Sequence, residues 1–199
     1  MTNQSDHEVQ QIEIGEETVV RYRSLSGFAG IISKILTYLI PLTGLVYLTG
    51  LSLVFKIRFP SQVYLPLFLG FSMVLVFLLL PFSKKTMKDS VPWYDWILIA
   101  GTAIATVYPA VNYKQIFLAG TFGVSDIEMV LGIVLIIAIL EAVRRTTGLA
   151  MVVVVIFFLV HARFAYYFPE LLMGPNSSMG QVLRFVYLSD QGAFGFILA

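Results

Sequence analysis

Residues 141–199 read EAVRRTTGLAMVVVVIFFLVHARFAYYFPELLMGPNSSMGQVLRFVYLSDQGAFGFILA, and this stretch decides the fold. An apolar run ends at the basic pair Arg144-Arg145, and a second apolar run follows, ending in aromatic residues and Pro169. A short polar turn and a small amphipathic segment come next. Because a membrane-spanning helix needs about 20 mainly apolar residues, the second run is long enough to cross a bilayer. The stretch therefore predicts a helical membrane protein.

The composition of the whole chain supports this prediction. Of the 199 residues, 58% are hydrophobic and only 13% are charged, and the mean hydropathy is +0.84. Soluble domains carry about 25% charged residues, so the bilayer is the expected solvent. The chain has no cysteine, which excludes disulfides, thiol nucleophiles and cysteine–metal sites. The net charge of +1 argues against a nucleic-acid partner.

Five apolar segments are long enough, or nearly so, to span the membrane. Backbone groups in lipid must be bonded internally, and these unbroken runs lack the alternation of barrel strands, so helices are expected. The fold class is therefore all-α and polytopic. The predicted spans are 31–55, 63–82, 93–111, 127–143 and 147–168.

The basic residues predict the orientation in the membrane. With the N-terminus in the cytoplasm, the cytoplasmic side would carry Arg21, Arg23, Lys34, Lys84, Lys85, Lys88, Arg144 and Arg145. The opposite side would carry Lys56, Arg58, Lys114, Arg163 and Arg184. This division is eight against five, and the two clustered loops fall on the same side, as the positive-inside rule requires.

The first 24 residues are predicted to be a disordered, acidic cytoplasmic tail. They lack the basic start and the short apolar run of a signal peptide.

Two capping boxes mark predicted helix starts. Ser125 and Glu128 have the S-x-x-E spacing just before the fourth span, and Ser178 and Gln181 repeat it further on. The second box predicts a short helix over 179–189 with a broad apolar face. It is too short to cross, so we expect it to lie at the membrane interface.

The order of these pieces resembles the fused permeases of tripartite ATP-independent periplasmic (TRAP) transporters of the TAXI type. The matching pieces are residues 141–148 (EAVRRTTG), the aromatic end of the fifth span with Pro169, and residues 187–195 (YLSDQGAFG). In that family a small four-span part is joined to a large transport part. The resemblance divides the chain into a tail (1–24), a four-helix small-subunit-like domain (25–145), a linking helix with a periplasmic turn (146–178) and the start of the transport domain (179–199).

The resemblance also implies a function. A periplasmic binding protein would deliver a small organic anion, typically a carboxylate, and a sodium gradient would drive its uptake across the inner membrane of a bacterium or archaeon. The four-span part would be the static scaffold that braces a moving transport part. The sequence stops at Ala199 inside an apolar run. The substrate and sodium sites are therefore expected outside it, and no cofactor is expected within it.

Ionisable residues inside spans are the first candidates for a functional role. His161 and Arg163, in the outer half of the fifth span, would face a polar pathway or a partner, or else Arg163 would extend outward while neutral His161 packs near the interface.

Glu141 lies on one helix face with Arg144 and Arg145, at i,i+3 and i,i+4. A cytoplasmic hinge or gate is one interpretation. The favoured one is a helix-end ion pair that also provides the positive-inside signal.

Small and hydroxyl residues gather in the third span. Gly101 and Ala105 form a small-x-x-x-small pair, with Thr102 and Thr106 beside them. We expect this span to be the packed centre of the four-helix unit. A sodium or substrate path along the two threonines is the less favoured alternative, because nothing anionic lies at mid-depth to offset the desolvation of a cation.

No pattern of an enzyme is present. H-E-x-x-H, G-x-S-x-G and P-loop motifs are all missing from the sequence, and we expect no catalytic activity. The alternative to a transporter part is a stand-alone membrane protein for interaction or assembly, without transport activity.

Overall fold

The computed structural model describes residues 22–50, 60–83, 90–119, 125–169, 172–189 and 192–195. Within these ranges the chain is helical and contains no strand. The α-helices are α2 (Gly27–Leu48), α4 (Ser61–Leu79), α5 (Trp93–Ala119), α6 (Asp126–Thr146), α7 (Leu149–Phe164) and α8 (Met179–Leu188), with a 3-10 turn η1 (Ala165–Tyr167). The first residues of the predicted tail (1–21) and the predicted lysine loop (84–88) lie outside the described residues.

The all-α, polytopic membrane class is confirmed. Four helical segments are long and apolar enough to cross a bilayer: Gly27–Leu48, Ser61–Leu79, Trp93–Ile116 and Leu149–Tyr167. The fourth predicted span (127–143) corresponds to α6, a helix of 21 residues, but it carries acidic residues in its first turn and charged residues near its end. These charges keep it outside the four that qualify by composition, although about 31 Å of helix is long enough to cross.

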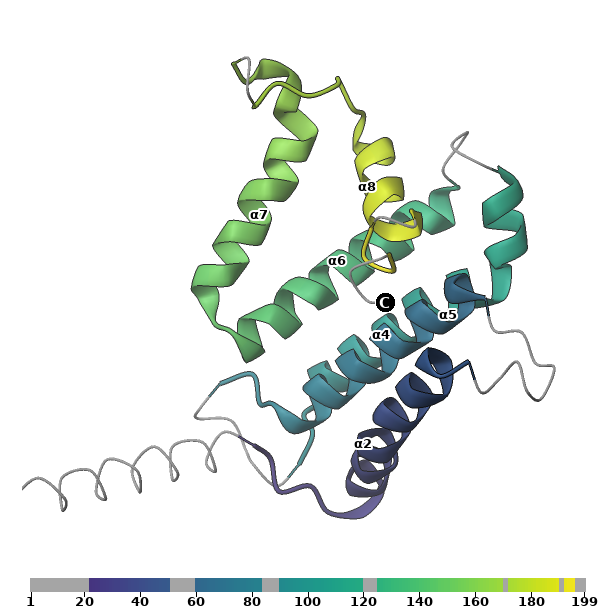
Figure 1. Cartoon of the computed structure of the whole chain (residues 1–199). Helices are drawn as coiled ribbons and strands as arrows, with labels where there is room; N and C mark the ends of the chain where they lie inside the picture. The colour runs from purple at the N-terminus through teal and green to yellow at the C-terminus, as the bar shows by residue number, and fades with distance from the viewer. Residues whose placement is uncertain are drawn as a thin grey trace, which may run out of the picture.

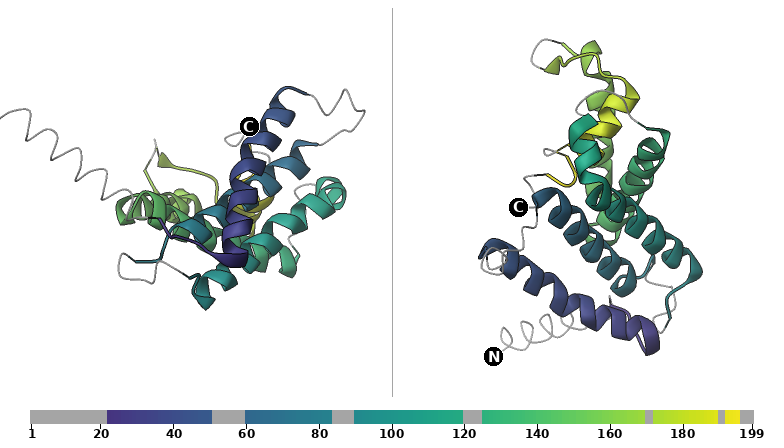
Figure 2. Two further views of the ribbon diagram at one scale, coloured as in Figure 1. Left: turned by 90° about the horizontal axis from the view of Figure 1, so that it is seen from below. Right: turned by 90° about the vertical axis from the view of Figure 1, so that its right-hand side faces the viewer.

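The helices α4, α5 and α6 form the centre of the molecule. Helix α5 packs against both α4 and α6, and α2 packs on the outer side of α4 (Figure 1). The two views of Figure 2 show α2 crossing the bundle obliquely. The core cluster joins Met73 and Phe77 of α4, Ala105 of α5 and Leu135 of α6 with Tyr187 of α8.

A glycine separates α6 from α7. Gly148 has φ +96°, a left-handed conformation that side chains rarely adopt, and it lets the chain reverse at once after α6. In Figure 1 the two helices diverge from this point like the arms of a V, and α8 lies between the arms. Helix α7 therefore leaves most of its apolar surface outside the bundle.

Both predicted capping boxes are confirmed. The Ser125 amide donates to Glu128 Oε2 over 3.1 Å at the start of α6. At the start of α8 the Ser178 amide donates to Gln181 Oε1 over 2.7 Å, and the Gln181 amide donates back to Ser178 Oγ over 3.2 Å. These local bonds satisfy amides that a helix start leaves unpaired, which is why sequence spacing alone located them.

Helix α8 forms where the sequence predicts it, but its placement differs from the expectation of a purely interfacial helix. Its apolar face packs on α6, and Leu183 and Tyr187 are buried. The Tyr187 hydroxyl reaches the carbonyl of Ala105, halfway along α5. Helix α8 thus enters the bundle from one end and reaches its middle.

Candidate functional site: a buried ion-pair network

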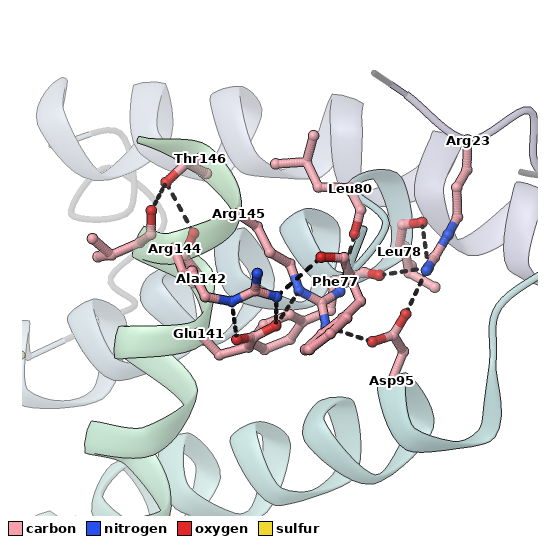
Figure 3. A network of polar contacts seen from close by, with 12 residues as sticks. Arg23, Phe77, Leu78, Leu80, Asp95, Glu141, Ala142, Arg144, Arg145 and Thr146 are labelled. Carbon is pink, nitrogen blue, oxygen red and sulfur yellow. Dashed lines mark hydrogen bonds and ion pairs between the residues drawn. The ribbon is translucent and has the colours of Figure 1, made fainter. Parts of the chain in front are cut away.

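One carboxylate sits at the centre of a buried ionic cluster. Asp95, in the first turn of α5, accepts from Arg23 Nη2 on one oxygen and from Arg145 Nη2 on the other, each over 2.6 Å (Figure 3). None of these three side chains has any solvent-exposed surface. A single aspartate therefore ties together the segment before α2, the start of α5 and the end of α6.

A second carboxylate extends the cluster along α6. Glu141 accepts from Arg145 Nε over 2.7 Å and from Arg144 Nε over 2.8 Å. Arg144 also stacks its guanidinium 4.2 Å from the ring centre of Phe82. The Arg144 side chain is 30% exposed, unlike the fully buried side chain of Arg145. The outer arginine faces the surface and the inner one belongs to the core.

The arginines also cap the last turn of α4. Arg23 Nη1 donates to the Phe77 carbonyl over 3.1 Å, and its backbone amide donates to Leu79 over 2.9 Å. Arg145 Nη1 donates to the Leu80 carbonyl over 3.0 Å. The final carbonyls of a helix have no partner within it, and in a membrane protein such groups need donors from elsewhere. The network thus completes the end of α4 while it neutralises Asp95.

The signs of the charges match the helix ends that hold them. Asp95 lies at the start of α5, where the helix dipole is positive, and Arg144 and Arg145 lie in the last turn of α6, where it is negative. Three guanidinium groups and two carboxylates leave a net charge of +1. Arginine does not release its proton in proteins, so this cluster is suited to holding segments together and not to proton transfer. We call it the Asp95 network, and the end of the bundle that contains it the network end.

The chain matches no protein-family model, no curated protein and no solved structure. Its function is therefore inferred from its own residues and their geometry.

The predicted ion pair of Glu141 with Arg144 and Arg145 is present, but it is one part of the Asp95 network. The favoured sequence interpretation treated both arginines as a helix-end pair whose position topology dictates. Arg145 is instead fully buried and bonded to α4 and α5. The two predicted cytoplasmic segments do meet, because Arg144 Nη2 donates to the Phe82 carbonyl, just before the lysine loop, over 3.1 Å.

Arg23 and Asp95 were not among the predicted site residues. Arg23 counted only toward the loop charges, and Asp95 stood within an aromatic anchor, Trp93-Tyr94-Asp95-Trp96. The available signal was that Asp95 is the one acidic residue in the predicted span 93–111. An acid in such a place needs a cationic partner, but the sequence does not show which of the 13 basic residues provides it.

The small residues of α5 lie at its contacts with both neighbours. A Cβ atom built on Gly101 would stand 3.1 Å from Val134 of α6, and one on Gly70 of α4 would overlap Thr106. Thr102 and Thr106 are buried. The Thr106 hydroxyl donates to the Thr102 carbonyl over 2.9 Å, so it serves its own helix. This geometry is that of a close-packed centre.

His161 and Arg163 are placed away from the network, at the far end of α7. His161 Nε2 lies 3.1 Å from the Leu172 carbonyl, and its ring packs edge-on against Phe168 at 4.7 Å. Arg163 lies 5.2 Å from the ring centre of Phe164. His161 thus contacts the segment that follows α7, and Arg163 contacts the aromatic end of α7 itself.

A cavity of about 810 Å³ lies between the bundle and the α7–α8 arm. Its walls come from α4, α5, α7 and α8 and include Pro66, Pro109, Phe158, Gln181, Phe185 and Phe194. No group of three or more histidine, aspartate or glutamate side chains that could hold a metal ion occurs among the described residues.

Proposed function

We propose that this chain is the membrane scaffold portion of a TRAP transporter of the TAXI type. The complete system would import small organic carboxylates, delivered by a periplasmic binding protein and driven by a sodium gradient. The chain would lie in the cytoplasmic membrane with its N-terminus and its network end inside. The proposal starts from the resemblance carried by residues 141–148 and 187–195.

The Asp95 network is the observation that most supports a scaffold. A scaffold must keep its shape while an attached transport part moves against it. Asp95 and its two arginines join four segments that are far apart in the sequence and leave their charges buried. Separating these segments would strand charges in a low-dielectric interior, which costs several kcal/mol, so the network end is suited to staying closed.

The outward surface of the helices also fits this role. Helix α7 exposes a long apolar face, including Val153, Phe157 and Val160, and α2 exposes Ile31, Ile35 and Leu42. Such faces are stable only against lipid or another apolar protein surface. The proposal assigns part of this surface to lipid and part to the transport domain. The substrate and sodium sites belong to that domain.

The test combines association and uptake. The tagged chain is expressed in its host, extracted in a mild detergent and purified, and the associated proteins are identified by mass spectrometry. We expect a large multi-span protein to co-purify. Sodium-dependent uptake of labelled carboxylates in host cells should fall when the gene is deleted and return when it is restored.

A scaffold role also predicts how two variants behave in the uptake assay. Asp95→Asn should not restore uptake, whereas Asp126→Asn, at an exposed position in α6, should restore it. Association only with unrelated proteins, together with uptake that does not change on deletion, would contradict the proposal. That result would favour the stand-alone interaction or assembly protein.

A further inference from the structure

A buried hydroxyl group of helix α8 reaches the centre of the bundle. The Tyr187 hydroxyl donates to the backbone carbonyl of Ala105 over 2.8 Å, although 82 residues separate the two. Tyr187 is 1% exposed. Its ring lies over Gly132 of α6, where a Cβ atom would stand 3.4 Å from the Tyr187 Cβ, and against Phe194 at 5.7 Å between ring centres.

The carbonyl that accepts this bond is not an ordinary helix carbonyl. In an α-helix the carbonyl of residue i accepts from the amide of residue i+4, which for Ala105 is Pro109. Proline has no amide hydrogen, so the usual backbone donor to this oxygen is missing. The neighbouring hydroxyl of Thr106 does not replace it, since it donates to Thr102 and Ala103. In a dry interior an unpaired carbonyl is costly.

One side of α8 borders the cavity and is not packed against another helix. Helix α8 has ten residues, and most of the described residues that join it to α7 are not helical. Residues of α8 form one wall of the 810 Å³ cavity. Arg184 Nη1 of α8 also lies 3.7 Å from Glu128 Oε2 of α6. Pro109 and Phe194 also line the cavity, so the tyrosine bond lies at its inner edge.

We propose that α8 is a movable re-entrant helix, latched in place when Tyr187 inserts its hydroxyl into the proline break of α5. Pro109 creates the acceptor and Tyr187 is the donor, so the two residues act as a pair. The latched state makes α8 a wall of the cavity, and release of the latch widens that cavity. This device depends on contacts within the chain and holds whether or not the chain serves a transporter.

The experiment measures how often α8 undocks from the bundle. The chain has no cysteine, so a single Leu183→Cys places one thiol on the buried face of α8. The purified full chain in mild detergent is treated with N-ethylmaleimide, and the labelling rate reports undocking. Met179→Cys, at an exposed position of α8 that does not line the cavity, serves as the control for reagent access. Circular dichroism verifies that each variant is helical.

A double-mutant cycle identifies the pair. Tyr187→Phe retains the ring and removes only the hydroxyl, and it should raise the labelling rate about tenfold, as expected for one interhelical hydrogen bond. In the Pro109→Ala background α5 regains the missing amide, so the same change should raise the rate less than about threefold. Labelling of the Met179→Cys control should stay the same throughout.

Equal acceleration in both backgrounds, or none in either, would overturn the proposal. If Pro109→Ala fails to fold, Pro109→Gly replaces it, because glycine also restores the amide while it tolerates the existing bend of α5.

Discussion

Asp95 has one guanidinium group at each of its carboxylate oxygens and no contact with solvent. A buried ion pair is a weak source of net stability, because both ions lose their water. Removing one partner is different, since the charges that remain are then buried and uncompensated. The network therefore specifies how its segments meet more than it adds to stability.

This asymmetry gives a prediction for Asp95. Asp95→Asn leaves two buried arginines short of one negative charge and should lower the free energy of unfolding by about 3–5 kcal/mol. The measurement is unfolding in mild detergent on addition of sodium dodecyl sulfate, followed by circular dichroism. Asp126→Asn removes the same charge from an exposed position in α6 and should change stability little. Similar losses for the two variants would show that Asp95 has no special role.

The two adjacent arginines give a second prediction. Arg145→Gln should destabilise the protein by about 3 kcal/mol or more, because Arg145 is fully buried and bonded to Asp95, Glu141 and Leu80. Arg144→Gln should lose at most about 1 kcal/mol, since this side chain is 30% exposed. The same unfolding assay compares them. If both arginines only set topology, the two losses would be equal.

At the scale of helices, close packing depends on where glycine stands. Gly70 lies in α4 where the Thr106 side chain of α5 approaches its backbone, whereas Gly44 of α2 has the Tyr64 hydroxyl oxygen 3.6 Å from its Cβ position. The first contact leaves no space for a methyl group and the second is an ordinary contact. Helices α4 and α5 can therefore approach as they do only because residue 70 has no side chain.

A pair of alanine variants tests this difference. Gly70→Ala should push α4 away from α5 and lower the free energy of unfolding by about 1–3 kcal/mol. Gly44→Ala should be neutral or slightly stabilising, because alanine is the better helix former. Thermal unfolding followed by circular dichroism provides the measurement. A neutral Gly70→Ala would mean that the α4–α5 contact is looser than described.

At the scale of the whole molecule, the main question of topology is whether α6 crosses the membrane. Its charges keep it outside the four segments that qualify by composition. However, its C-terminal end contacts the end of α4 at the network, and its 21 residues extend about 31 Å from there. Its charges lie near its two ends, and the middle of α6 contributes Leu135 and Ala138 to the core. We therefore expect α6 to cross.

Cysteine labelling tests this expectation. Ser90 precedes α5 and Asn176 follows α7, so three crossings by α5, α6 and α7 would place them on opposite faces. In intact cells Asn176→Cys should react with a membrane-impermeant maleimide, and Ser90→Cys should react only after the membrane is opened. If both positions react from one face, α6 does not cross. If Ser90→Cys alone reacts in intact cells, the network end faces outward and the predicted orientation is wrong.

The sequence by itself determined the membrane environment, the helical secondary structure and the starts of two helices. Apolar composition requires lipid, lipid requires helices, and capping boxes act over three residues, so all three can be inferred from short windows of the chain. Helix ends follow less directly from the sequence. The third span was predicted to end at 111, but α5 continues to Ala119.

Only the tertiary structure decided which polar groups meet. Asp95 pairs with Arg23, 72 residues away in the sequence, and with Arg145, 50 residues away. Tyr187 bonds to Ala105, 82 residues away. Each partner has its own local explanation, as a loop charge, an interfacial acid or a residue on an amphipathic helix, and no spacing rule links them. The physical reason is that a buried charge or an unpaired carbonyl needs a partner of the right kind, and which one it meets depends on how the helices pack.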